Sequence, residues 1–255
     1  MEETRFLLMP MMLRSKIINI TFFFLFLVLT LNLTHSTQKT NLIENKKYLR
    51  SYLLYLKGNS FLKELKADQA ILYYKKAIKE YNSYPEPYSK LAKVFFDQND
   101  LNAVEKYLRS AGKSESLFRN IEDQAEYYRT GAQFYEKRKE YGNSLKYYQK
   151  LLPLDSNDPF INFRIGYLYY LLKDLDSSYT YLDQFVKDKS VNERRNKEEI
   201  QKAYKIIVNI LSDKKKYDDA LNYLKELYRK YPEKQVLERI TILSNNLKYY
   251  DKKDH

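Results

Sequence analysis

The sequence lacks most of the residues on which enzyme chemistry depends. None of its 255 residues is cysteine, which excludes disulfides, thiolate chemistry, a lipidated cysteine and sulfur ligands for zinc. Histidine, the commonest general acid or base, occurs only as His35 and as the final residue, His255, where no packed shell can position it. There is no glycine-rich phosphate loop and no calcium-loop spacing. We therefore predict no enzyme activity, no cofactor and no metal site.

Carboxylates are abundant, but no motif arranges them for catalysis. Pairs such as Glu198-Glu199 and Asp218-Asp219 fall in polar turns or on expected exposed helix faces. A serine or threonine nucleophile would need one of these carboxylates, or a lysine, as its base. The pattern favours ordinary solvated side chains at these positions.

Charge is also missing from one stretch near the N-terminus. Ile17–Gln38 contains no charged side chain and follows Arg14 and Lys16, a pattern typical of a targeting or anchoring segment. Cations before the apolar run favour keeping that end in the cytoplasm, so the rest of the chain is expected to be exported. We predict that residues 1–36 are a signal peptide or an N-terminal membrane anchor, and that the protein lies in the periplasm or cell envelope of a bacterium.

The choice between a cleaved and a retained leader stays open. The most apolar part, Ile20–Leu33, falls between the roughly 7–15 residues of a signal peptide and the about 20 of a spanning helix. Thr34-His35-Ser36 would allow cleavage before Thr37, although it is a weaker site than A-x-A. If it is not cleaved, the segment anchors the chain in the membrane, which is then a partner of the protein. Met11 and Met12 are alternative starts to Met1, since either leaves a shorter basic head.

The net charge of the chain is strongly positive, at +12. A basic surplus suits anionic partners such as nucleic acid or a membrane surface. The same chain is also rich in Lys, Asn, Ile and Tyr together, as AT-rich coding produces, and we favour that compositional explanation. We expect no nucleic acid partner.

The remainder of the chain has the pattern of an all-α protein. Residues 37–50 read as a polar tether and a leading helix, and from Asn45 onward apolar residues recur at helical spacing with almost no strand-like alternation. The glycines and the later prolines fall where they punctuate or pack helices. No low-complexity linker divides this part, which predicts one helical domain.

A repeat of about 34 residues runs through residues 51–234. Its five units are residues 51–84, 85–118, 125–158, 159–192 and 201–234. With each unit numbered from one, position 20 carries Ala70, Val104, Ser144, Ser178 and Ala220. Position 17, which is expected to open a second helix, carries Ala67, Leu101, Tyr141, Leu175 and Tyr217. The small residues at position 20 are predicted to let the two helices of a unit approach closely.

The first unit shows the pattern most fully. Leu54, Gly58 and Phe61 stand at positions 4, 8 and 11, and Ala70, Tyr74 and Ala77 stand at positions 20, 24 and 27. This pattern resembles the tetratricopeptide repeat, whose signature places large, small and aromatic residues at these positions. The resemblance implies a right-handed helical solenoid of about five helix-turn-helix repeats.

A helix after the last repeat is expected to close the stack. Val236, Ile240, Leu243 and Leu247 follow one another at helical spacing and give one apolar stripe. A terminal repeat would otherwise expose its apolar face. We therefore predict that residues 235–255 form a capping helix and a charged tail.

The resemblance also implies where a partner would bind. Tetratricopeptide-like domains present positions 2, 5, 9 and 12 of their first helices in a concave groove. From those positions we select Tyr52, Tyr55, Asn59, Lys93, Phe96, Arg129, Gln133, Phe160, Phe163, Tyr167, Tyr170, Lys205 and Asn209 as groove residues. The fourth unit supplies four aromatic residues to this set. Exposed, they would form an apolar strip for a helix or peptide; the alternative is that a loop or a neighbouring helix covers them.

The family's clamp for a C-terminal carboxylate is not predicted. Asn59 fits one of its positions, but Lys90 stands where the second unit would need asparagine. Our hypothesis is a non-catalytic scaffold of the bacterial envelope that binds, and in one version stabilises, another envelope protein through the groove. The alternative is a basic surface-binding module for anionic lipid or cell-wall polymer. Salt separates the two, because binding to polyanions weakens steeply with ionic strength.

Overall fold

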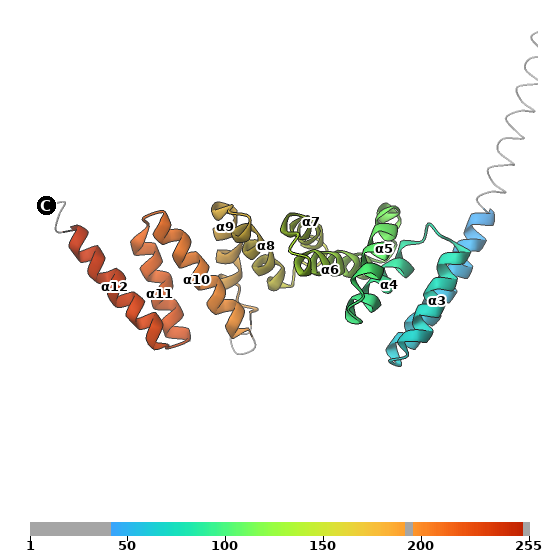
Figure 1. The fold of residues 1–255 in the computed structure, drawn as a ribbon, viewed down its shortest axis with the longest axis horizontal. Helices are drawn as coiled ribbons and strands as arrows, with labels where there is room; N and C mark the ends of the chain where they lie inside the picture. The colour runs from blue at the N-terminus through green and yellow to red at the C-terminus, as the bar shows by residue number, and fades with distance from the viewer. Residues whose placement is uncertain (1–41, 192–195, 252–255) are drawn as a thin grey trace, which may run out of the picture. The chain divides into compact units, whose positions relative to one another are not determined.

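In a computed structural model, residues 42–191 and 196–251 are described, and these are helices, turns and loops without a strand (Figure 1). Helices form because apolar side chains recur every three to four residues and bury one face of each segment. None of the helices in these two ranges is long and apolar enough to span a membrane. The leader predicted for residues 1–36 lies outside the described residues, as does His255.

The chain divides into two units, with the boundary after Pro87. The first unit contains a helix over residues 42–63 and α3, Ala67–Glu80. The residues expected as a leading helix continue without a break into the first helix of the first repeat. Ala70, Tyr74 and Ala77 of α3 are fully buried. Gly58 is required opposite them, because a Cβ at that position would lie 2.5 Å from the Tyr74 ring.

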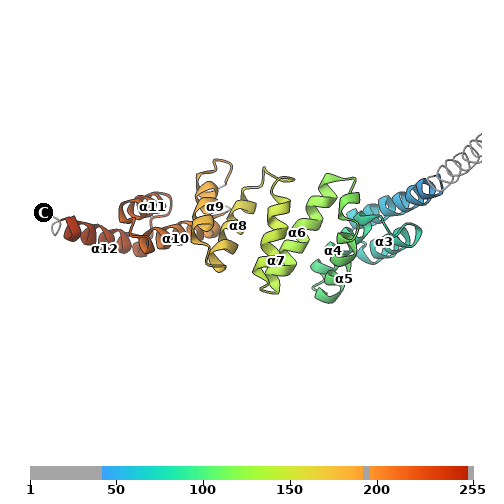
Figure 2. The ribbon, with the colours of Figure 1, turned by 90° about the horizontal axis from the view of Figure 1, so that it is seen from above.

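The second unit is a run of helices that begins within α4, and from α5 to α12 each α-helix packs on the next. Figures 1 and 2 show these consecutive helices side by side. They are α4 (Pro85–Asp97), α5 (Leu101–Gly112), the short 3-10 helix η1 (Glu115–Leu117), α6 (Ile121–Lys137), α7 (Tyr141–Leu151), α8 (Pro159–Leu171), α9 (Leu175–Lys187), α10 (Lys197–Asp213), α11 (Tyr217–Lys230) and α12 (Lys234–Asp251). The all-α, helix-turn-helix architecture predicted from the sequence is confirmed.

The 34-residue pattern marks the second helix of every repeat. Its position 17 is the first residue of α3, α5, α7, α9 and α11. Its position 20 is completely buried in all five repeats. A small side chain is needed there because the two helices of a repeat approach most closely at that point.

Each repeat also reverses direction in the same way. The residue at position 15 has a positive φ in all five units: Leu65 (59°), Asn99 (63°), Lys139 (60°), Lys173 (68°) and Lys215 (58°). The next backbone N–H then donates to the carbonyl oxygen at position 11, as from Lys66 to Phe61 at 2.9 Å. This closes the first helix with a left-handed residue. Only Asn99 is a residue type that favours this conformation.

The core of the second unit reaches into the last helix. Phe185 and Val186 of α9, Ile207 of α10, Leu224 of α11 and Val236 of α12 belong to one buried cluster. Ile240 and Leu243 pack against that cluster while half-buried. The apolar stripe of α12 therefore lies on α11, where it covers the end of the last repeat.

Candidate partner-binding surface

A stack of two rings and a cation joins α8 and α10, and its outer part, the Tyr167 ring and the Lys202 ammonium, reaches the surface. The rings of Phe163 and Tyr167, one helical turn apart on α8, lie 6.2 Å apart and only 5° from parallel. Lys202 of α10 places its Nζ 3.5 Å from the centroid of the Tyr167 ring. Tyr167 is half-buried and Lys202 is exposed. The stack therefore offers an aromatic ring and an ammonium group together to a ligand.

Of the two alternatives for the aromatic residues of the fourth repeat, exposure or cover by a neighbouring helix, the second holds for Phe163. Its side chain is 2% exposed and belongs to the main core cluster, where its ring lies 5.2 Å from that of Phe185. The reason is that α8 is enclosed by α9 and by α10 of the next repeat. Phe160 and Tyr170 are half-buried, so they keep part of their surface.

The basic edge of this surface lies on α10. Lys202, Lys205 and Asn209 follow at steps of three and four and are all exposed. Neither lysine forms an ion pair with any residue in the described ranges. Asn209 accepts a hydrogen bond of 3.0 Å from the Arg239 guanidinium of α12. Lys202 thus presents a cation beside the Tyr167 ring, while Lys205, three residues further along α10, is among the lysines that lower the pKa of the Glu233 carboxyl.

The predicted groove residues of α6 are more constrained. The Arg129 guanidinium forms an ion pair with Asp155 and lies 3.9 Å from a carboxylate oxygen of Asp158. Gln133, one turn further along, is half-buried. The charge of Arg129 is therefore compensated within the protein, and this part of the surface attracts an anion less than α10 does.

The predicted residues of α4 are engaged in a similar way. Lys93 donates to Asp97 on the same helix at 2.6 Å. Phe96 is half-buried, and Lys137 of α6 places its Nζ 5.7 Å from the centre of the Phe96 ring. The structure thus brings aromatic and basic residues together on α4 and α6, but here each lysine already has a partner.

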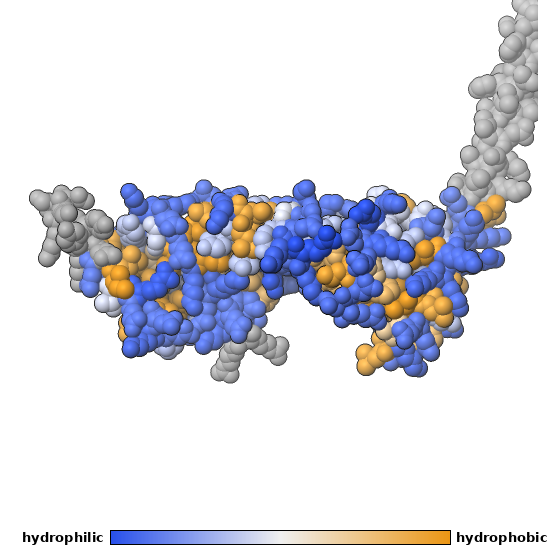
Figure 3. Space-filling model, in the orientation of Figure 1, coloured by the Kyte–Doolittle hydropathy of each residue, from blue (hydrophilic) through white to orange (hydrophobic). Residues whose placement is uncertain are grey.

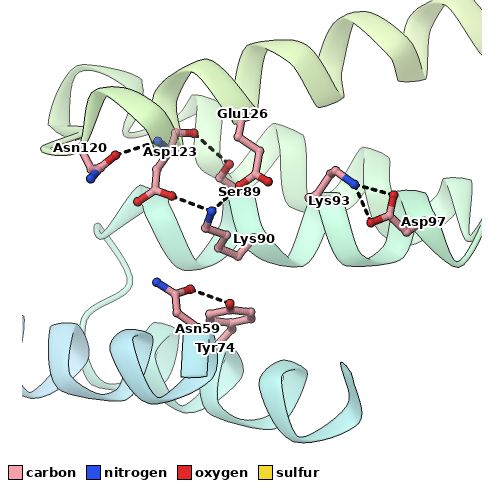
Figure 4. Close-up of polar contacts among 9 residues, drawn as sticks. All are labelled: Asn59, Tyr74, Ser89, Lys90, Lys93, Asp97, Asn120, Asp123 and Glu126. Atoms are coloured by element: carbon pink, nitrogen blue, oxygen red, sulfur yellow. Dashed lines mark hydrogen bonds and ion pairs between the residues drawn. The ribbon is translucent and has the colours of Figure 1, made fainter. Parts of the chain in front are cut away.

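The first unit contributes three predicted residues, and one of them is not at the surface. Tyr55 is only 5% exposed, which corrects its assignment to a groove. Its ring packs edge-on against Tyr84 at 5.6 Å and near Tyr74 at 6.0 Å. Tyr52 is exposed, and Asn59 accepts a 2.7 Å hydrogen bond from the Tyr74 hydroxyl (Figure 4).

A polar cluster between α4 and α6 went unrecognised in the sequence. Figure 4 shows the Lys90 ammonium between the carboxylates of Asp123, at 2.8 Å, and Glu126. Burial acts to lower the pKa of Lys90, but Glu126 and Asp123 outweigh it and hold that pKa above its usual value. Asp123 is itself buried. Lys90 is therefore a structural cation, because its charge is compensated by Asp123 and Glu126.

Sequence spacing alone could not reveal this cluster. Lys90 stands at position 6 of its unit, and its partners stand 33 and 36 residues later, in the helix of the next repeat. The only available signal was a near-repeat separation between opposite charges. Within residues 42–191 and 196–251, no group of three or more metal-ligating side chains is arranged around a common point.

Several solved structures share this architecture. YrrB, "a TPR protein with an unusual peptide-binding site", superposes with a TM-score of 0.59 over 79% of this chain and 96% of its own, at 15% identity. MamA gives a TM-score of 0.52 over 70% and 96%, at 20% identity. The C-terminal part of a TPR repeat-containing protein from Cytophaga hutchinsonii gives 0.54 over 74% and 72%, at 15% identity. No protein-family model and no curated protein matches the sequence.

Proposed function

Because the chain has the tetratricopeptide-repeat fold, we propose that it is a non-catalytic scaffold that binds a segment of another protein on the first-helix faces of its repeats. The partner segment carries acidic and apolar side chains together. It reaches the protein in the bacterial cell envelope, to which the charge-free run Ile17–Gln38 directs the chain.

One observation carries this proposal: the Lys202 ammonium lies over the half-buried Tyr167 ring, without an ion-pair partner among the described residues. A carboxylate of the partner would pair with Lys202 or Lys205, while an apolar side chain would cover Tyr167 and Tyr170. Burial of aromatic rings supplies most of the affinity at low entropic cost, since a tyrosine has few rotatable bonds. The cations supply orientation and a faster association rate.

The likeness to YrrB supports a peptide or extended segment as the form of the ligand. YrrB carries a peptide-binding site, and most of its length superposes on this chain. Asp155 and Asp97 compensate the charges of Arg129 and Lys93, so these residues of α4 and α6 add little net charge to the surface. Selectivity for acidic ligands then comes from α10.

The test is affinity capture from solubilised envelope with the tagged full chain as bait, at about 0.15 M and about 0.5 M salt, a range over which exposed charge pairs are progressively screened. The test variant is Tyr167→Ala/Lys202→Ala, which keeps the buried Phe163 but removes a half-buried ring that packs against the core. The control variant, Tyr181→Ala/Lys146→Ala, removes the same residue types from the second helices α9 and α7. Circular dichroism verifies that both variants stay helical.

We expect one envelope protein to be retained by the native and control baits at both salt concentrations and lost with the test variant. Material that binds all three baits equally and elutes at about 0.5 M salt would point instead to the basic surface-binding module, because only long-range charge attraction is that sensitive to salt. A captured protein that binds the test variant as well as the native chain would remove α8 and α10 from the binding surface.

A further inference from the structure

A seam of exposed leucines runs along the helix over residues 42–63. Leu42, Leu49, Leu53 and Leu56 are 56%, 55%, 58% and 42% exposed. They follow at steps of seven, four and three residues, so at 100° per residue they lie within about 60° of the helix circumference. Figure 3 shows hydrophobic surface patches on this unit. We call these four residues the leucine seam.

The equivalent face of later repeats is covered by a helix. Leu53 stands at position 3 of its repeat, where the third, fourth and fifth repeats carry Tyr127, Ile161 and Ala203, which are 2%, 2% and 0% exposed. The Tyr127 hydroxyl lies against Gly112 at the end of α5, so close that a Cβ on Gly112 would be 2.9 Å from it. In the same way α8 packs on α7, and α10 packs on α9.

In the third, fourth and fifth repeats, position 3 is therefore where the repeat receives the second helix of the repeat before it. No helix in the described part of the chain precedes residues 42–63 to fill that place. The leucine seam has the chemistry and the geometry of a helix-accepting face. It ends at Ser60, where the later repeats carry the apolar residues Phe134, Leu168 and Ile210, so an occupant covers about four turns.

The charges beside the seam select among occupants. Lys46, Lys57 and Arg50 are exposed and lie on one flank, about 20–60° around the helix from Leu53. A second copy of the chain is disfavoured as the occupant, because it would bring the same cations to the contact. The run Ile17–Gln38 of this chain is disfavoured because it has no carboxylate to pair with them. A helix that binds a lipid surface carries a broad apolar face. The leucine seam is narrower, and a seam of this width is typical of helix–helix packing.

We propose that the leucine seam is a second docking site, which takes an amphipathic helix of another protein whose own apolar seam is flanked by Asp or Glu. The leucines interdigitate with the apolar side chains of that helix, and its carboxylates pair with Lys46, Arg50 and Lys57. The occupant takes the place of a preceding repeat, so it extends the stack by one helix. This site is independent of the surface on α8 and α10.

The test is fluorescence anisotropy of a labelled synthetic helix with the full chain. The probe has about three heptads with Leu at positions a and d and Glu at e and g, a pattern that pairs with basic flanks; the control probe carries Lys in place of Glu. Leu53→Ser/Leu56→Ser removes two of the four leucines of the seam. Leu65→Ser/Leu72→Ser, two exposed leucines of the same unit outside the seam, is the matched control.

We expect the Glu probe to bind the native chain and the control variant at least tenfold more tightly than it binds Leu53→Ser/Leu56→Ser. The Lys probe should bind poorly. The charge reversal Arg50→Glu/Lys57→Glu should exchange the preference of the two probes, which a purely hydrophobic contact would not do.

Three results would overturn the proposal. The first is equal binding of the Glu and Lys probes, or no binding of either. The second is a dimer in sedimentation that Leu53→Ser/Leu56→Ser abolishes, with no probe binding, since the seam would then pair with a second copy. The third is seam-dependent flotation with phosphatidylglycerol vesicles in place of probe binding, which would make the seam a lipid contact.

Discussion

The Ser144 hydroxyl donates a buried hydrogen bond of 2.9 Å to the carbonyl oxygen of Ala132, and so joins the second helix of its repeat to the first. Ser178 stands at the same position of the next repeat and is equally buried, yet its hydroxyl has no partner within the described residues. A serine at the same repeat position thus has a hydrogen-bonded hydroxyl in the third repeat and a hydroxyl without a partner in the fourth.

This difference predicts opposite effects of one substitution. Ser144→Ala should lower the free energy of unfolding by about 1 kcal/mol, because it removes a satisfied buried hydrogen bond. Ser178→Ala should raise that free energy or leave it unchanged, since it removes a hydroxyl that lost its water without gaining a partner. Urea denaturation of the two variants beside the native chain checks this. Equal losses in both would show that Ser178 finds a partner in solution.

Glycine-to-alanine substitutions at two positions should have opposite effects on stability. A methyl group at Gly166 would lie 2.7 Å from Leu182 Cγ and 3.0 Å from the Leu182 backbone nitrogen, so Gly166→Ala should cost about 1–3 kcal/mol through overpacking. Gly142 has no atom within 4 Å of that position and lies in the first turn of α7. Gly142→Ala should therefore stabilise the chain by up to about 1 kcal/mol, since alanine is the better helix former. Thermal unfolding followed by circular dichroism distinguishes the two.

The left-handed residue of each turn predicts sites where glycine stabilises. Lys139→Gly and Lys215→Gly should each raise the free energy of unfolding by roughly 0.5–1 kcal/mol, because an L-residue at positive φ costs about 1–2 kcal/mol and glycine recovers most of that. Lys146→Gly, on the exposed face of α7, should instead cost about 1 kcal/mol. Denaturation midpoints of the three variants measure this. A loss of stability at Lys139 equal to that at Lys146 would contradict the expectation.

Glu115 predicts a dependence of stability on acidic pH. Burial acts to raise the pKa of its carboxyl, but hydrogen bonds from Lys150, at 2.7 Å, and from the Tyr128 hydroxyl, at 2.6 Å, outweigh burial and lower that pKa below its ordinary value. A carboxyl with a lowered folded-state pKa contributes stability above its unfolded pKa of about 4.3, and this contribution is lost as pH falls through the folded value.

The measurement is the thermal midpoint as a function of pH, from neutral pH to below about 4.3, where a free glutamic acid becomes protonated. Glu115→Gln should unfold at a lower temperature than the native chain at neutral pH, and the gap should narrow as the pH falls. Tyr128→Phe, which removes one of the two donors, should show an intermediate slope. Parallel curves for the native chain and Glu115→Gln would mean that Glu115 does not carry this dependence.

The helical architecture was readable from the sequence because its signals are local and repeated. The first residue of each second helix, from Ala67 to Tyr217, and the buried small residue three positions later both follow from the 34-residue pattern. Five copies of a pattern average out the ambiguity of any one copy. The left-handed turn residue was not predicted. Leucine and lysine, which stand there as Leu65, Lys139 and Lys215, are not residue types that indicate a positive φ.

The candidate surface was predicted only in part, because exposure depends on the neighbouring repeat. Phe163 and Tyr167 belong to the same predicted face of α8, yet the first is in the core and the second keeps part of its surface. Tyr55 is buried by rings of its own unit. A repeat pattern predicts which face of a helix a residue lies on, whereas burial also changes from one turn to the next along that face, as between Phe163 and Tyr167.

The sequence by itself thus determined the period, the helix class and the close contacts within each repeat, since these depend on residue size and spacing along one chain. Only the tertiary structure decided which aromatic rings reach solvent, which lysines keep an available charge, and that Leu53 lies open while Tyr127, Ile161 and Ala203 are covered. Those outcomes depend on which helix packs against which, and helix–helix contact between repeats joins residues that are not neighbours in the sequence, such as Lys90 with Asp123 and Glu126.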